Sequence, residues 1–259
     1  MTISPRRCLM WKVCGIGAPI LVALLLVPSL VWSYRPFVST DAAVAAPREV
    51  EIELGSVTLE RTRRETTFSV PSLVVNYGVV AAWEVVAEFR TEASPEFELA
   101  DPALLVKGVL KEGVLQDKEG VSVAVEAGAL LPSTLRGEHG IGFEAIGIVS
   151  GRLGPFMLHV NGGGGVDRGG GRPFGLWGLI GELPVHPRVR IVSEVEGQTT
   201  SARAPNDSAL LGIIWKPTSS NVYLDAGIRH GLSRGAPDWL ATVGLTFGFS
   251  ISPFWRSPF

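Results

Sequence analysis

The stretch TVGLTFGFSI, residues 242–251, decides the fold class. Every second residue in it is apolar: Val243, Leu245, Phe247, Phe249 and Ile251. Threonine, glycine and serine stand between them. Because successive side chains of a β-strand point to opposite faces of the sheet, this alternation predicts a strand with one apolar and one polar face.

The same alternation recurs along the chain, for example over 83–90, 121–130 and 222–229, and no segment shows a convincing helical period. It predicts twelve strands, at 49–60, 65–75, 79–91, 103–111, 121–131, 140–151, 154–163, 173–183, 187–196, 208–216, 221–230 and 239–251. An even number of alternating segments of roughly ten residues, separated by turn residues, is typical of an outer-membrane β-barrel. We therefore expect a transmembrane antiparallel up-and-down β-barrel of about twelve strands.

The connections between these segments alternate in length. Short turns are expected at 76–78 (Asn-Tyr-Gly), 151–153, 184–186 and 217–220, each after an even-numbered strand. Longer polar or glycine-rich loops are expected at 92–102, 132–139, 164–172, 197–207 and 231–238. Outer-membrane barrels have short turns on the periplasmic side and longer loops outside. The connection at 112–120 is longer than this rule prefers.

A soluble β-sandwich shows the same alternation, with its apolar residues facing an internal core. Strand number, strand lengths near the 9–11 residues that span a bilayer, and abundant glycine in the polar register favour the membrane barrel. Aromatic residues expected near strand ends would form interfacial girdles: Trp83, Trp177, Trp215, Trp239 and Tyr77.

The first residues resemble an export signal. Arg6, Arg7 and Lys12 precede an uncharged, largely apolar run at 15–32, and the small residue Ser33 follows it. We expect a cleaved signal peptide at 1–33. A later cut near Ala43-Val44-Ala45 and an uncleaved anchor helix are alternatives.

After this leader we expect a periplasmic lead segment at 34–48, the barrel at 49–251 and a tail at 252–259, in which Pro253 and Pro258 break the alternation. There is no second long apolar run, which excludes a helical membrane protein. Both cysteines, Cys8 and Cys14, lie in the leader. Cleavage would change the formal charge from −2 to 20 − 25 = −5, so a general affinity for nucleic acid is not supported.

Three stretches resemble an outer-membrane protein family named after the MetA pathway of phenol degradation. They are Arg35-Pro36-Phe37 with Thr40-Asp41-Ala42, the run Val75–Val80, and GVSVAVEAGALLP at 120–132. In that family they look like the mature N-terminus, the first periplasmic turn and a strand entering an external loop. The resemblance implies an outer-membrane barrel that passes small, aromatic or hydrophobic molecules, and it carries over no catalytic or binding residues.

Enzymatic motifs are weak. Gly231-Leu232-Ser233-Arg234-Gly235 matches the G-x-S-x-G pattern of hydrolases, but it falls in an expected loop with no following helix. The four histidines, His139, His159, His186 and His230, have no metal-ligand spacing. His159 stands in the polar register of a strand, near no obvious nucleophile in sequence. The glycine-rich run at 161–165 lacks the phosphate-loop pattern and is expected in an external loop.

Charged residues in the polar register are the expected lumen-lining set: Glu84, Glu88, Arg90, Glu126, Glu144, Arg188, Arg190, Glu194, Glu196, Asp225 and Arg229. Charges of both signs could pair and fill the interior, or line a narrow aqueous path, and the strand number does not decide between the two. In the second case, charge reversal at Arg188 or Arg190 should change ion selectivity.

The favoured function is a passive channel or transporter for small molecules in the outer membrane, without catalysis, cofactor or metal. Its expected partners are outer-membrane lipid, the barrel-assembly machinery and a small solute, and not nucleic acid. The alternatives are a closed structural or adhesive barrel that acts through its outer loops and, with less support, an outer-membrane hydrolase.

Overall fold

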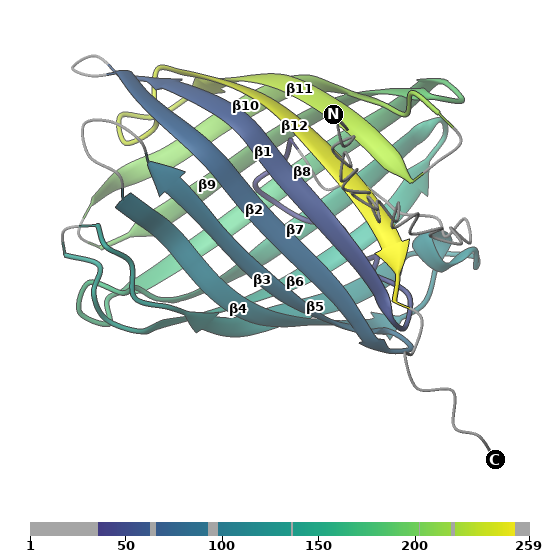
Figure 1. Ribbon diagram of the computed structural model, residues 1–259, viewed down its shortest axis with the longest axis horizontal. Coiled ribbons are helices and arrows are strands. Elements are labelled where there is room, and N and C mark those ends of the chain that lie inside the picture. Colours follow the sequence, from purple (N-terminus) through teal and green to yellow (C-terminus); the bar gives the residue numbers. More distant parts are fainter. Residues whose placement is uncertain are drawn as a thin grey trace, which may run out of the picture.

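The computed structural model describes residues 36–62, 66–92, 98–135, 137–201, 203–218 and 221–251. Twelve antiparallel strands form one closed barrel in which each strand pairs with its neighbours in sequence (Figure 1). The strands are β1 (Glu49–Arg61), β2 (Thr66–Val80), β3 (Trp83–Glu92), β4 (Glu98–Lys111), β5 (Ser122–Leu130), β6 (Gly142–Leu153), β7 (Phe156–Val166), β8 (Pro173–His186), β9 (Val189–Thr200), β10 (Arg203–Trp215), β11 (Val222–Gly231) and β12 (Trp239–Ser250). A 3₁₀ turn, η1 (Val114–Gln116), lies between β4 and β5. The predicted twelve-stranded up-and-down barrel is confirmed.

The barrel closes where β1 pairs with β12. The pairing runs from Glu49 opposite Ser250 to Arg61 opposite Trp239, with one irregularity between Gly55 and Val57. β1 pairs with β2 on its other side. No strand is therefore left with a free edge, and the strand that decided the fold class, β12, is the strand that completes the sheet.

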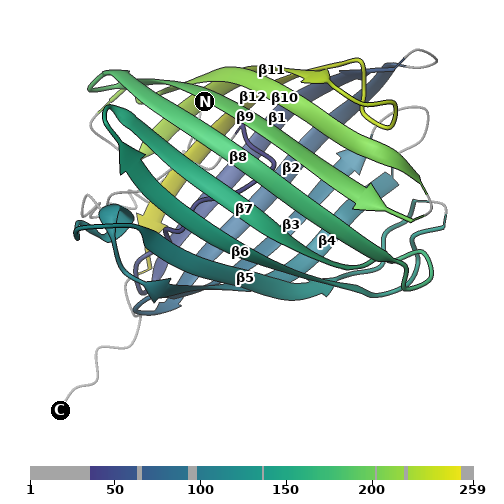
Figure 2. The same ribbon diagram turned by 180° about the vertical axis from the view of Figure 1, so that it is seen from behind.

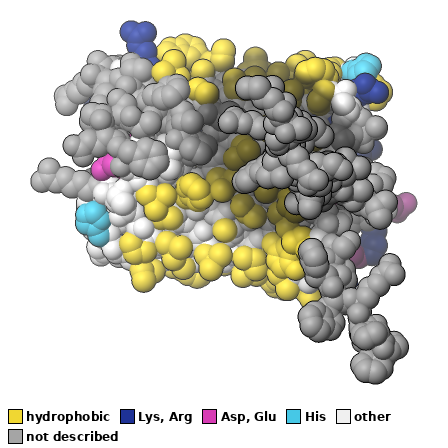
Figure 3. Space-filling view, in the orientation of Figure 1, with side chains coloured by type: hydrophobic (Ala, Val, Ile, Leu, Met, Phe, Trp, Pro, Cys, Tyr) yellow, Lys and Arg dark blue, Asp and Glu magenta, His cyan; other side chains and the backbone are white. Residues whose placement is uncertain are grey.

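The alternation places apolar side chains outside and polar side chains inside. Along β12, Thr242 and Thr246 are buried, whereas Val243 between them is 54% exposed. On β3, Glu84 is buried and Trp83 is exposed. Figure 3 shows apolar side chains over the middle of the described surface and charged side chains towards its two ends. This is the surface of a membrane-spanning barrel, not of a sandwich with an apolar core. Among the described residues, no helix is long and apolar enough to cross a membrane.

The aromatic residues expected near strand ends are exposed there. Trp83 begins β3 and Trp215 ends β10, both at the end of the barrel that carries the short turns. Tyr77 lies close to the same end, on β2. Trp239 begins β12 at the opposite end, and Trp177 lies near that end of β8. Their positions fit two interfacial girdles.

Three predicted turns are wrong by a few residues. β2 continues through Asn76 and Gly78, and the chain turns at Ala81 and Ala82, the latter with φ 66°. Asn76 reads like a turn residue, but its side chain points inward and donates to Glu53 Oε1 at 3.1 Å. The sixth and eighth strands likewise extend to Leu153 and His186, so those connections lie at 154–155 and 187–188.

The loop predicted at 197–207 is also wrong, because β9 continues to Thr200 and β10 begins at Arg203. Strand ends beyond the apolar band need no apolar residues, so their polar sequence resembled a loop. The run at 161–165 belongs to β7, where both neighbouring strands pair with it. The expected leader at 1–33 and tail at 252–259 lie outside the described residues.

A substitution at Val160 can test which face of the sheet contacts lipid. It is 52% exposed at the centre of β7, opposite the exposed Val149 and Leu179 on the neighbouring strands. Val160→Arg should lower the free energy of unfolding by about 2–4 kcal/mol, because a basic side chain would face mid-depth lipid. Urea titration of the protein refolded into lipid vesicles measures this. Leu153→Arg, at the turn end of β6, is the control and should cost only about 0–1 kcal/mol. Equal, small effects would contradict the membrane orientation.

Candidate functional site: the barrel lumen

The interior holds a cavity of about 700 Å³. Residues from all twelve strands line it, so it is the barrel lumen and not a surface groove. Carboxylates that line it include Glu88, Glu126 and Glu144 on β3, β5 and β6. These three side chains are partly exposed, which shows that the cavity is hollow beside them.

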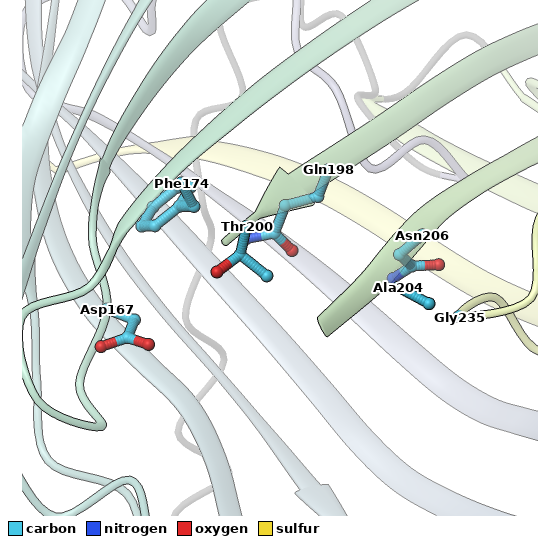
Figure 4. A pocket seen from close by; sticks show the side chains of 7 residues that line it. All are labelled: Asp167, Phe174, Gln198, Thr200, Ala204, Asn206 and Gly235. Atoms are coloured by element: carbon cyan, nitrogen blue, oxygen red, sulfur yellow. The ribbon is translucent and has the colours of Figure 1, made fainter. Parts of the chain in front are cut away.

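A second pocket of about 230 Å³ lies at the end of the barrel that carries the longer loops (Figure 4). Asp167 and Gly235, in the loops after β7 and β11, lie on its rim. Phe174, Gln198 and Asn206 line both this pocket and the larger cavity. The two spaces therefore adjoin, and the lumen approaches the surface at the loop end.

The other half of the lumen is occupied by the chain itself. Residues 36–47, the lumen segment, precede β1 and run inside the barrel, where both ribbon views show them (Figures 1 and 2). Phe37 to Thr40 line the cavity, and Asp41 to Ala43 are buried. The sequence predicted a periplasmic lead at 34–48, whereas residues 36–47 of it fill the turn-side half of the lumen.

Side chains of four strands hold the backbone of the lumen segment. The Glu194 carboxylate accepts hydrogen bonds from the N–H groups of Val38 (3.1 Å) and Ser39 (2.7 Å). Asn161 accepts from the N–H of Thr40 at 3.1 Å and donates to its carbonyl oxygen at 2.8 Å.

Further along the segment, Ser150 Oγ accepts from the Ala42 N–H at 3.0 Å. Glu84 Oε2 accepts from the Ala45 N–H at 2.6 Å. Wall side chains thus accept hydrogen bonds from five N–H groups of the segment, which does not pair as a strand.

The wall also makes room for this segment. A Cβ atom at Gly178 would lie 2.9 Å from the Ser39 Cβ, and one at Gly78 would collide with the carbonyl oxygens of residues 45 and 46. Gly78 therefore permits a close backbone approach, and it is not the turn residue that its sequence context suggested.

The predicted lumen residues fall into three groups. Those that line the cavity are Glu88, Arg90, Glu126, Glu144, Glu196 and Arg229. Glu84, Glu194 and Asp225 are buried and do not line it.

The third group consists of two arginines that lie away from the cavity. Arg190 pairs with Glu182 at 2.7 Å and lies over the ring of Tyr223. Arg188 is exposed in the turn between β8 and β9 and donates to the Pro217 carbonyl, because β9 begins only at Val189. Neither arginine lines the cavity, so they are poor positions for a selectivity test.

Arg229 carries the central ion pairs. Its guanidinium donates to Glu194, to Glu196 at 3.0 Å and to Ser208 at 2.8 Å, so it holds the same carboxylate that binds the lumen segment. Arg90 pairs with Glu92 and Asp101, and Lys107 Nζ lies 3.8 Å from Glu84. Lys107 also donates to Thr40 Oγ1 at 3.0 Å. Arg90, Lys107 and Arg229 line the cavity, so charges pair in its wall and a hollow space remains beside them. The lumen segment, and not paired charges alone, fills the other half of the lumen.

Sequence reasoning missed Ser150 as the neighbour of His159. The two residues are directly opposite each other on β6 and β7, and His159 Nδ1 lies 2.8 Å from Ser150 Oγ. His159 Nε2 lies 3.4 Å from Glu182 Oε1. This order resembles a hydrolase triad, but all three side chains are buried, none lines the cavity, and Ser150 accepts from Ala42. The cluster anchors the lumen segment. The pairing of Ser150 with His159 could be found only from the register between β6 and β7, which places the two residues opposite each other.

Ser233 of the G-x-S-x-G match makes hydrogen bonds within the loop end of the barrel. Ser233 Oγ donates to the Pro205 carbonyl at 2.5 Å and accepts from the Asp207 N–H at 2.7 Å, which ties the β11–β12 loop to β10. Within the described part of the chain, no group of three or more His, Cys, Asp or Glu residues could hold a metal ion.

No known protein family and no curated protein matches this sequence. Solved structures do. The COG4313 outer membrane channel from Pseudomonas putida F1 superposes with a TM-score of 0.60 at 9% identity, over 80% of this chain and 97% of that one. The NanC porin superposes with a TM-score of 0.53 at 9% identity, over 77% of this chain and 98% of its own.

The chain has the fold of an outer-membrane β-barrel. Identities this low show the fold alone, so the likeness bears on the barrel and not on the cavity or the lumen segment.

Arg229 should be critical for stability. Arg229→Gln leaves the buried Glu194 without its cationic partner, and breaking a buried pair in this way costs about 3–5 kcal/mol. Urea unfolding in vesicles measures the loss. Arg172→Gln breaks the more exposed pair with Asp167 and should cost about 0–1 kcal/mol. If the two variants unfold at the same urea concentration, the Arg229 cluster does not stabilise the barrel.

Proposed function

We propose that this protein is a passive outer-membrane channel for small solutes. The observation that carries the proposal is the 700 Å³ cavity, which all twelve strands enclose and which adjoins a pocket at the loop end. A barrel that served only as a scaffold would have no need of a hollow half. The apolar outer band supports insertion in a bilayer, and the expected leader supports export to the outer membrane.

The charge of the cavity suggests which solutes pass. Among the described residues, the carboxylates that line it are Glu53, Glu88, Asp101, Glu126, Glu138, Glu144, Asp167 and Glu196. The basic residues are Arg90, Lys107, Arg168 and Arg229. Eight acidic groups against four basic groups give a formal charge of −4 when all are ionised. Fixed charge on a channel wall attracts counter-ions, so small cations are the favoured solutes.

Cation preference can be measured at alkaline pH, where the carboxylates are ionised, from the reversal potential in a KCl gradient across a planar bilayer. The open channel should prefer K⁺ over Cl⁻, and Glu88→Gln, Glu126→Gln and Glu144→Gln combined should reduce that preference, because they remove three carboxylates from the wall. Glu112→Gln, at an exposed residue outside the cavity, is the control and should change nothing. Anion preference, or an unchanged reversal potential in the triple variant, would contradict the assignment.

The channel itself is tested by single-channel recording from the full chain and from a variant without residues 36–47. Discrete conductance steps from at least one of them are expected. Silence from both at high protein load, with folding verified by heat-modifiable gel mobility, would overturn the channel. The filled half of the lumen would then favour the closed structural or adhesive barrel.

A further inference from the structure

The hydrogen bonds of the lumen segment are made mainly by its backbone, while Phe37, Ala42 and Ala43 pack against apolar side chains of the wall. Glu194, Asn161, Ser150 and Glu84 accept from its N–H groups, and Gln116 donates to the Ala42 carbonyl at 2.9 Å. Thr40 is the segment residue whose side chain bonds the wall, through Lys107. Hydrogen bonds to N–H and C=O groups do not depend on side chains, so these wall groups recognise a peptide backbone, bent at Val38, Ser39 and Ala42, rather than a particular sequence.

The polar partners come from separate strands. Glu84 lies on β3, Ser150 on β6, Asn161 on β7 and Glu194 on β9, so the site spans the lumen from one wall to the other. At least three of these side chains are almost fully buried: Glu84 and Glu194 are 1% exposed and Ser150 is 0% exposed. Arg229 and Lys107 lie beside the two carboxylates, and the N–H groups of the segment supply the further hydrogen bonds that Glu194 and Glu84 accept.

The wall is also shaped for the occupant. Beyond Gly78 and Gly178, the glycines at 212 and 227 lie against Pro36, where an added Cβ atom would approach the proline ring to 3.1 Å and 3.2 Å. Four strands thus lack side chains where the segment passes. The acceptors and the glycines together form a complementary surface that neither the sheet nor the cavity requires.

We propose that the lumen wall is a binding site for a peptide backbone and that residues 36–47 are its displaceable occupant, a plug that closes the channel. The proposal rests on the proposed function. The plug closes the path because its residues 37–40 end the cavity, while its residues 41–43 are buried among side chains of the turn-side half. The channel conducts when the plug leaves. Hydrogen bonds to wall acceptors, several of them charged, hold it but are reversible in water.

The decisive experiment compares single-channel conductance of the full chain with that of the variant lacking residues 36–47. The variant should show several-fold higher conductance or open time. Equal conductance would overturn the plug and leave the channel standing. Silence from both would overturn the channel and the plug together.

A synthetic peptide of residues 36–47 tests the site separately from the deletion. Added to the variant on the short-turn side, it should block the current with a frequency that rises with peptide concentration. The same peptide with proline at the positions of Ser39 and Ala42 lacks two of the bonded N–H groups and should block weakly. No block by the native peptide, or equal block by both peptides, would overturn the backbone-binding site.

Point variants provide the same test where the deletion fails to fold. Ser39→Pro with Ala42→Pro removes two N–H donors to the wall and should raise the open time of the full chain several-fold. Val44→Pro is the matched control, because no hydrogen bond of the Val44 N–H is found among the described residues. An open time that rises equally in both, or in neither, would overturn the plug.

Discussion

The hydrogen-bonded seam between β1 and β12 is the constraint on which the rest of the structure depends. A bilayer offers no water to unpaired peptide groups, so a sheet can cross it only if the first and last strands pair. This seam joins residues at the two ends of the described barrel, Glu49 and Ser250, and leaves no free edge. Once it is closed, the register of every strand is set, and a slip by one residue would turn apolar side chains inward and charges into lipid.

The closed register in turn produces an acidic interior. Inward positions on β1 alone carry Glu49, Glu51 and Glu53, all buried. Basic residues neutralise part of this charge, as Arg229 does for Glu194 and Glu196. Glu194 also accepts a hydrogen bond from a peptide N–H of the lumen segment, as does Glu84. The lumen segment therefore supplies hydrogen bonds to carboxylates that the register places inside the barrel.

The division of the lumen into a filled and a hollow half also follows from this arrangement. On the turn side, His159, Ser150 and the lumen segment exclude solvent. On the loop side, Glu88, Glu126 and Glu144 are partly exposed to the cavity. The strands are continuous across both halves, so the difference lies in what occupies the interior and not in the wall. The lumen segment is bound by hydrogen bonds and by the apolar contacts of Phe37, Ala42 and Ala43. It has no strand pairing and no covalent cross-link among its described contacts, so it is suited to leave.

The strand number, the strand order and the face of most side chains within the strands could be predicted from sequence, because the bilayer enforces period-two alternation along each strand. Arg188, predicted to face the lumen, lies in a turn instead. Asn76 and Gly78 show where local interpretation fails. They resemble a turn, but they serve contacts with Glu53 and with the lumen segment. The polar ends of β9 and β10 were misjudged because a strand beyond the apolar band has no period that distinguishes it from a loop.

Only the tertiary structure decided where residues 36–47 lie, which charges pair and which residues line the cavity. Val38 and Glu194 are 156 positions apart and meet through a backbone N–H, a group that every residue except proline carries. Such a contact leaves no trace in the amino-acid sequence. The sequence by itself determined the barrel, and the folded barrel determined what fills it.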